Sequence, residues 1–116
     1  MLIFLWKLIY RLSDDGFGFN LWRKKCEKIS NVLVIIHTKK DYVFGGYTSK
    51  GWQQDAKSTN QYTEDHKAFM FSIRMSNDTS YKPVLANPRK PQQAININTQ
   101  SVCIFGSSWY VDTNFL

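Results

Sequence analysis

The sequence predicts a mainly β (α+β) fold, a two-sheet antiparallel β-sandwich with a short helix near the N-terminus. In residues 69–75, large apolar side chains recur at every second position, which is the period of a strand. Residues 32–36 form a continuous apolar run of strand length that is rich in β-branched side chains. Aromatic residues make up 16% of the 116 residues, a share that suits pleated strands better than a helical bundle.

The N-terminal region is expected to contain one strand and one helix. Residues 2–12 are apolar enough for a buried strand, which should end at the turn residues 13–16. From Phe19 to Ile29, apolar side chains then recur at spacings of three and four, which predicts a short helix. A helix this short is not stable alone, so its apolar side must pack on a sheet.

A hairpin and a long loop are expected next. Residues 32–36 and 42–44 are predicted to be strands joined by a polar turn. Gly45 and Gly46 then interrupt the second strand, and paired glycines in a strand pattern usually mark a bulge or a close backbone approach. Residues 50–67 are polar, and a loop of this length in a compact domain is often a binding element.

The C-terminal part is predicted to contribute further short strands. A turn over residues 77–82 follows the strand at 69–75, and residues 87–91 form a stiff basic connection. Residues 95–98 and 102–105 have the composition of strands. In total, we expect about seven strands and one helix, in a single domain over residues 1–116.

The net charge of +6, from 15 basic and 9 acidic residues, favours an acidic partner: nucleic acid, an anionic membrane face or an acidic protein surface. The basic residues form no long run, so a solvated surface is the simpler interpretation. A basic nucleic-acid-binding domain stays open as an alternative, although the sequence has no ribonucleoprotein-type aromatic motif and no long basic helix. The apolar residues 1–10 are too few for a transmembrane span.

A few residues are candidates for chemistry. A thiol-dependent redox or hydrolytic enzyme would use Cys26 or Cys103, with His37 or His66 as the base. Cys26 lies on the apolar side of the predicted helix, where a thiolate is disfavoured, and neither histidine has a metal-ligand spacing. The glycines match no dinucleotide-binding loop. We therefore expect no catalytic residue, metal, cofactor or small-molecule substrate, and a cytoplasmic protein with reduced cysteines.

Four sequence blocks follow one another along most of the chain. They are WKLIYR with DGF and Cys26 (residues 6–26), VFGGYTS with Trp52 (residues 43–52), KAFMFSI (residues 67–73), and NP followed by AI (residues 87–95). In this order they resemble the TLDc family, which is named for its association with TBC and LysM domains. The block VFGGYTS is the most specific of the four.

The resemblance implies a two-sheet sandwich with short flanking helices and no settled catalytic site. Members of the family protect cells against oxidative stress, and several bind the vacuolar proton-pumping ATPase and regulate its assembly. The resemblance therefore implies a non-catalytic protein-interaction module. Its expected partner is a protein complex such as the peripheral sector of that pump.

The C-terminal residues depart from the family pattern. Family members usually continue with a block similar to GPTFGGGHDLYI, whereas residues 104–111 lack the His-Asp pair and two of the glycines. Family members also run on through further strands beyond the position of Leu116. We therefore expect a sandwich without its final strands, as in a fragment or truncated gene product, unless another chain completes it and covers the exposed strand edge.

Two sets of residues receive an expected role. The first set is the family signature, expected to be mostly scaffold: Gly16, Phe17, Phe44, Gly45, Gly46, Tyr47, Thr48, Ser49 and Trp52. The second set is a candidate contact surface on the basic helix face and the polar loop: Arg23, Lys24, Lys28, Lys50 and Lys57. The second set lies on exposed elements that packing does not constrain, which makes it the better candidate for docking.

Overall fold

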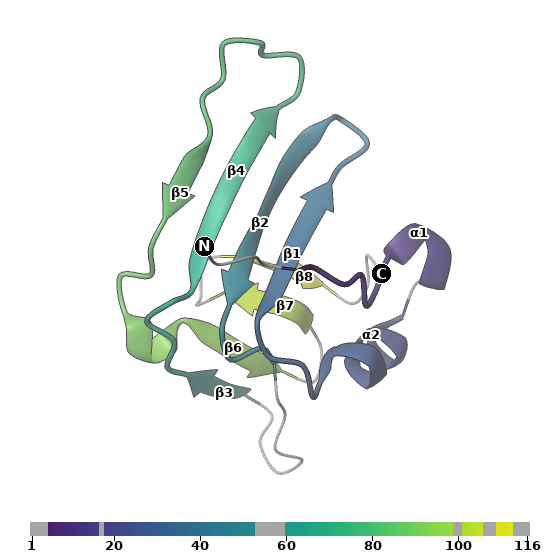
Figure 1. Cartoon of the computed structure of the whole chain (residues 1–116), viewed down its shortest axis with the longest axis vertical. Coiled ribbons are helices and arrows are strands. Elements are labelled where there is room, and N and C mark those ends of the chain that lie inside the picture. The colour runs from purple at the N-terminus through teal and green to yellow at the C-terminus, as the bar shows by residue number, and fades with distance from the viewer. Residues whose placement is uncertain (1–4, 17, 53–59, 99–100, 106–108, 113–116) are drawn as a thin grey trace.

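The computed structural model describes residues 5–16, 18–52, 60–98, 101–105 and 109–112. Within these ranges the chain forms strands, two short α-helices and a 3-10 turn (Figure 1). The elements are α1 (Leu12–Asp15), α2 (Phe19–Cys26), β1 (Val32–His37), β2 (Tyr42–Thr48), β3 (Asn60–Thr63), β4 (Phe69–Met75), β5 (Val84–Ala86), η1 (Pro91–Gln93), β6 (Ile95–Asn98), β7 (Ser101–Phe105) and β8 (Trp109–Asp112).

The strands form two four-stranded sheets, in the orders β1-β2-β4-β5 and β3-β6-β7-β8. Every pairing in both sheets is antiparallel. In Figure 1, the second sheet lies across the lower end of the first, and the upper parts of β1, β2, β4 and β5 extend beyond it. The predicted mainly β, antiparallel fold with a short helix near the N-terminus is therefore confirmed.

The core lies where α2 and the two sheets meet. Its buried apolar side chains are Trp22, Cys26, Val32, Trp52, Ala68, Ala94, Ile95 and Phe105. Trp52 is the centre of an aromatic chain, since its ring meets that of Trp22 at 5.7 Å and that of Phe105 at 5.2 Å, both edge to face. Edge-to-face contacts of this kind add to the stabilisation from burial, so Trp52 joins the helix to the second sheet.

The glycine pair lies inside β2 and does not interrupt it. A Cβ at Gly45 would collide with the backbone carbonyl oxygen of Val34 in β1, and a Cβ at Gly46 would lie 2.6 Å from the Phe105 ring in β7. The close backbone approach expected at this pair is therefore present, whereas the prediction that the pair interrupts the strand is wrong. The irregularity in pairing with β4 falls just before it, between Val43 and Phe44.

The strand predicted at residues 2–12 is wrong in the part that the structure describes. Residues 5–11 lie outside regular elements, and one turn of helix follows in α1. The acidic residues of this turn favour the helix, because Asp15 accepts a hydrogen bond of 2.7 Å from the backbone N–H of Arg11. Ile9 and Tyr10 pack against the core, while Leu5 is 92% exposed.

Three elements and one boundary differ from the prediction. The sequence at β3 has only Tyr62 as an apolar residue, so the strand inside the predicted loop 50–67 gave no alternation signal. The three residues of β5 are all exposed, and β8 lies in the region where the family pattern is lost. The helix α2 is as predicted but ends at Cys26, so Ile29 lies outside it.

Replacing Gly45 with alanine is expected to destabilise the fold by about 3 kcal/mol or more, because the colliding atom of Val34 is backbone and belongs to the β1–β2 ladder. The Gly46→Ala variant is expected to lose about 1–3 kcal/mol, since the side chain of Phe105 can shift. Urea denaturation gives both values.

The matched control is Gly16→Ala, at a position with a φ of 88° and no atom within 4 Å of the added Cβ. Only backbone strain of about 1–3 kcal/mol is expected there, because residues with a Cβ rarely adopt a φ of 88° with a ψ of 175°. A Gly45→Ala variant no less stable than Gly16→Ala would contradict the close packing of β1 on β2.

Candidate functional site

The end of β2 is tied to the start of β4 by one buried carboxylate. Asp65, two residues past β3, is only 2% exposed. Its Oδ2 accepts hydrogen bonds from the Thr48 hydroxyl at 2.7 Å and from the Ser49 backbone N–H at 2.8 Å. Its Oδ1 accepts from the Ser49 hydroxyl at 2.7 Å and from the Lys67 backbone N–H at 3.0 Å. We call Thr48, Ser49 and Asp65 the carboxylate junction.

The Thr48 hydroxyl both donates and accepts hydrogen bonds. While it donates to Asp65, its oxygen accepts the backbone N–H groups of Lys50 and Gly51, each at 3.1 Å. Gly51 has a φ of 71°, a left-handed conformation that favours glycine. The resulting turn directs the chain from β2 into the core, where Trp52 is 4% exposed.

The carboxylate junction also reaches the second sheet. The backbone N–H of Asp65 donates to the carbonyl oxygen of Pro91 at 2.9 Å, and Pro91 begins η1, just before β6. One residue thus connects β2, β4 and η1.

Burial by itself would raise the pKa of the Asp65 carboxyl, but hydrogen bonds outweigh it. The hydroxyls of Ser49 and Thr48, followed by the backbone N–H groups of Lys67 and Ser49, lower this pKa below its ordinary value of 3.8. Asp65 is therefore an anion at neutral pH. Both of its oxygens are already used by internal donors, which suits a structural role.

The other described signature residues have internal contacts as well. The Tyr47 ring stacks on Phe69 with centroids 5.3 Å apart, and its hydroxyl donates to Asn31 Oδ1 at 2.9 Å. The carbonyl oxygen of Gly16 accepts the Tyr10 hydroxyl at 2.8 Å. Phe44 is half-buried within β2, and Phe17 lies outside the described residues.

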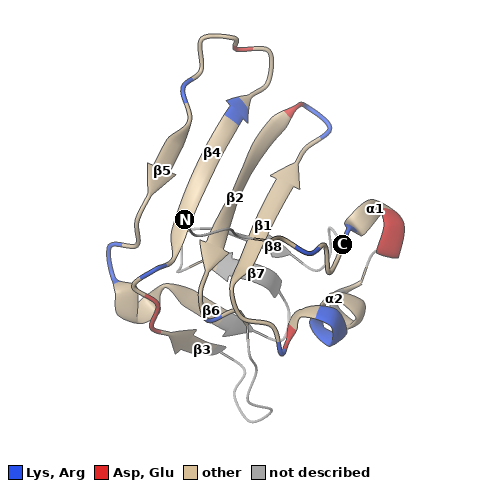
Figure 2. Cartoon of the chain, viewed as in Figure 1, with Lys and Arg blue, Asp and Glu red and all other residues tan. Residues whose placement is uncertain are grey.

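The candidate contact residues are not equally available. Lys24, Lys28 and Lys50 are exposed. Arg23 is half-buried, and its Nε lies 3.4 Å from Glu27 Oε2. Lys57 lies outside the described residues. Figure 2 shows the basic residues of α2 on the opposite side of the molecule from those that follow β5.

The candidate thiol and histidines do not form a catalytic arrangement in the described part of the chain. Burial raises the pKa of the Cys26 thiol to about 11, so the thiol is protonated at neutral pH. His37 contacts Asp41 at 2.8 Å and His66 contacts Glu64 at 2.6 Å, all of them exposed or half-buried side chains. Cys103 belongs to β7, and its side chain lies outside the described residues.

Within the residues that the structure describes, no three histidine, cysteine, aspartate or glutamate side chains are grouped so that they could hold a metal ion. No helix in the same residues has the length and apolar character needed to cross a membrane.

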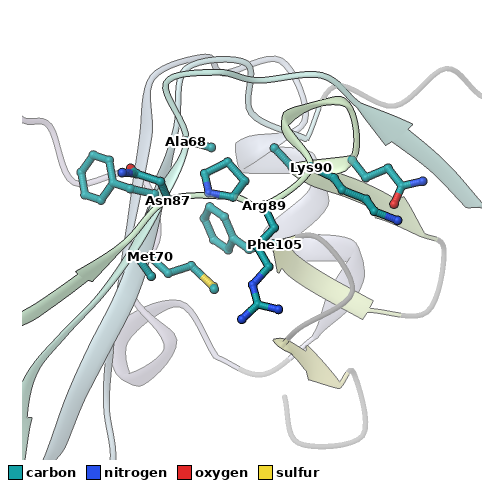
Figure 3. A pocket seen from close by; sticks show the side chains of 11 residues that line it. Ala68, Met70, Asn87, Arg89, Lys90 and Phe105 are labelled. Carbon is teal, nitrogen blue, oxygen red and sulfur yellow. The ribbon is translucent and has the colours of Figure 1, made fainter.

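A groove of about 510 Å³ opens between β4, the end of β5 and η1 (Figure 3). Ala68, Ala94 and Phe105, each 3% exposed, form its apolar base together with Met70. Its lining also includes the following polar or charged residues: Asn87, Arg89, Lys90 and Gln93. We call this site the β4–β5 groove.

Sequence reasoning missed both the carboxylate junction and the groove. Asp65 lies in a polar stretch next to Glu64 and His66, where nothing in the sequence marks it as buried. Arg89 and Lys90 were recognised only as a basic connection, because the groove needs side chains from distant segments. Thr48 and Ser49 were expected to be scaffold, and in the structure the hydroxyls of both donate to Asp65.

Replacing Asp65 with asparagine is expected to lower the free energy of unfolding at neutral pH by about 3 kcal/mol, because the amide cannot accept all four donors. Urea denaturation of this variant and of the exposed control Asp14→Asn gives the comparison, and the control should change by less than about 0.5 kcal/mol.

The same pair of proteins tests the pKa of Asp65. A lowered pKa in the folded state stabilises the fold above the unfolded value of 3.8, and this contribution is lost as the pH falls through the folded pKa. The difference between the unaltered chain and Asp65→Asn should therefore narrow below about pH 4. A difference that is constant down to about pH 2 would disagree with the lowered pKa.

Comparison with known proteins places the sequence in a family. Over 68 residues the chain is 24% identical to a zebrafish (Danio rerio) protein named MTOR-associated protein MEAK7. The aligned segment is 59% of this chain and 14% of that protein, so the chain spans only a small part of the relative. No solved structure matches the chain. The TLDc domain family matches residues 3–116, and the chain therefore belongs to the TLDc family.

Proposed function

We propose that this chain is a non-catalytic protein-interaction module of TLDc type that docks on a larger assembly. The observation that carries the proposal is the carboxylate junction, in which the polar signature residues Thr48 and Ser49 bind the buried carboxylate of Asp65. These groups are not available to a substrate. The functional surface is therefore assigned to exposed side chains elsewhere on the domain.

The proposed partner is the peripheral sector of the vacuolar proton-pumping ATPase, and the proposed role is regulation of that pump and resistance to oxidative stress. Support comes from family membership and from a net charge of +6, which complements an acidic protein surface. The zebrafish relative is named an MTOR-associated protein, which is in line with a role in protein interaction. We also propose that the protein acts in the cytoplasm and that residues 1–116 form a single domain.

The proposed contact surface includes Lys24 and Lys28, which lie one helical turn apart on and just after α2, and Lys50 beside the carboxylate junction. All three side chains are exposed. In the described part of the chain no acidic side chain pairs with these lysines, and such exposed lysines can form ion pairs with a docking protein at little desolvation cost.

Catalysis by Cys26 is not part of the proposal. Its thiol is buried and its raised pKa of about 11 keeps the nucleophilic thiolate scarce. The two described histidines are engaged with acidic side chains at the surface.

The test is a pull-down of the purified peripheral sector of the vacuolar ATPase with the immobilised chain. The unaltered chain should retain the sector, and Lys24→Glu/Lys28→Glu should retain roughly tenfold less, because two attractive contacts become repulsive. The matched control is Lys39→Glu/Lys40→Glu, which makes the same charge change at the exposed β1–β2 turn.

Circular dichroism first establishes that each variant is folded. If the unaltered chain does not retain the sector, the proposed partner is wrong. If both double variants lose retention equally, net charge and not the α2 surface governs binding.

A further inference from the structure

The β4–β5 groove combines an apolar base with positive charge at its rim. Figure 3 shows Arg89, Met70 and Phe105 around the same opening, with Lys90 to one side. Among the residues that the structure describes, no aspartate or glutamate lines the groove. An occupant of this groove would therefore meet apolar surface and uncompensated positive charge together.

The two cations at the groove differ from several other basic residues of the chain. Arg11, Lys25 and Arg74 each form an ion pair at 3.2 Å or less. Arg89 and Lys90 are exposed and pair with no acidic side chain in the described part of the chain. Between Thr79 and Val111, the sequence contains no acidic residue at all. This charge pattern is complementary to an anionic ligand.

The size of the groove suits part of a peptide. Its volume of about 510 Å³ lies within the range of roughly 300–1,000 Å³ that is usual for ligand sites. One large apolar side chain and its neighbouring backbone can enter such a space. Burial of an aromatic side chain against Phe105 and Met70 would supply affinity that charge alone does not.

The adjoining strand favours an extended backbone. β5 is the outermost strand in the order β1-β2-β4-β5, so one side of it has no hydrogen-bonded strand among the described residues. Val84 and Leu85 are 55% and 60% exposed on this strand. An unpaired edge with exposed apolar residues is a site where an extended peptide can add as a further strand.

We propose that the β4–β5 groove binds an extended acidic peptide segment of a partner protein, whose large apolar side chain enters the groove and whose carboxylates pair with Arg89 and Lys90. This inference rests on the proposed function, since it assigns a second contact surface to a protein-interaction module. The surface lies on the opposite side of the molecule from α2 (Figure 2).

Two other anionic partners fit the groove less well. Binding to an anionic membrane usually uses clusters of about four to eight basic residues on a flat or convex surface, whereas this site is concave and has two. Binding of single-stranded nucleic acid needs exposed aromatic rings for base stacking, whereas Phe105 is 3% exposed at the bottom of the groove.

The test uses a fluorescein-labelled peptide of about twelve residues, composed of aspartate and glutamate with one central phenylalanine. Fluorescence anisotropy with the full chain should show saturable binding. Binding should be roughly tenfold weaker for Arg89→Glu/Lys90→Glu and for a peptide with alanine in place of the phenylalanine. The Lys39→Glu/Lys40→Glu variant should bind the unaltered peptide as the unaltered chain does.

A further variant, Ala86→Trp, fills the groove without a change of charge, since Ala86 is an exposed lining residue. This variant should weaken binding of the peptide roughly as much as the charge reversal at Arg89 and Lys90 does. Melting curves establish that every variant is folded. Absence of saturable binding, equal loss in both charge-reversed variants, or indifference to the phenylalanine would overturn the proposal.

Two controls separate this inference from its rivals and from the proposed function. The first control uses vesicles that contain phosphatidylserine. If the chain binds these vesicles through Arg89 and Lys90 but does not bind the peptide, the groove is a membrane site and the peptide proposal is overturned. The second control is the pump pull-down. If the unaltered chain does not retain the pump but still binds the peptide, the proposed partner is wrong and the groove inference stands. If the chain retains the pump but does not bind the peptide, the groove inference is wrong and the proposed partner stands.

Discussion

A single ionised carboxylate inside the protein holds the ends of the two sheets together. Asp65 is only 2% exposed, yet it accepts four hydrogen bonds from Thr48, Ser49 and Lys67. A buried charge without such partners would be costly, whereas charge-assisted hydrogen bonds are among the strongest in proteins. The backbone of Asp65 then reaches Pro91, so the junction positions β2, β4 and η1 relative to one another. The β4–β5 groove lies between two of these three elements and depends on the same junction.

The glycines and the aromatic residues complete the same arrangement. Gly46 lets the Phe105 ring approach β2, and Phe105 also meets Trp52, which the turn at Gly51 directs into the core. Phe105 forms part of the base of the groove as well. Several described signature residues thus make internal contacts, and exposed basic residues lie, among other places, at α2 and beside β5. A module that docks on a large assembly can use such surfaces separately or together, and binding at two sites gains affinity through effective concentration.

The sequence was informative wherever one periodicity dominated. The alternation in β4, the β-branched run of β1 and the three-four spacing in α2 predicted those elements, and the block VFGGYTS identified the family. Prediction was wrong at residues 5–11, where apolar side chains are only partly packed, and it missed the polar β3 and the three-residue β5. The burial of Asp65 and the position of Arg89 at the groove beside Phe105 depend on contacts between distant segments, which no local pattern encodes.

The central claim is that Thr48 and Asp65 form one energetic unit that fixes the scaffold. A double-mutant cycle with Thr48→Val, Asp65→Asn and their combination, each measured by urea denaturation at neutral pH, tests it directly. The hydrogen bonds that the Thr48 hydroxyl oxygen accepts from the backbone N–H groups of Lys50 and Gly51 are lost in both legs of the cycle and cancel, so the coupling reports the contact with Asp65. A coupling energy of about 1–3 kcal/mol is predicted. Effects that add to within about 0.5 kcal/mol would contradict the claim.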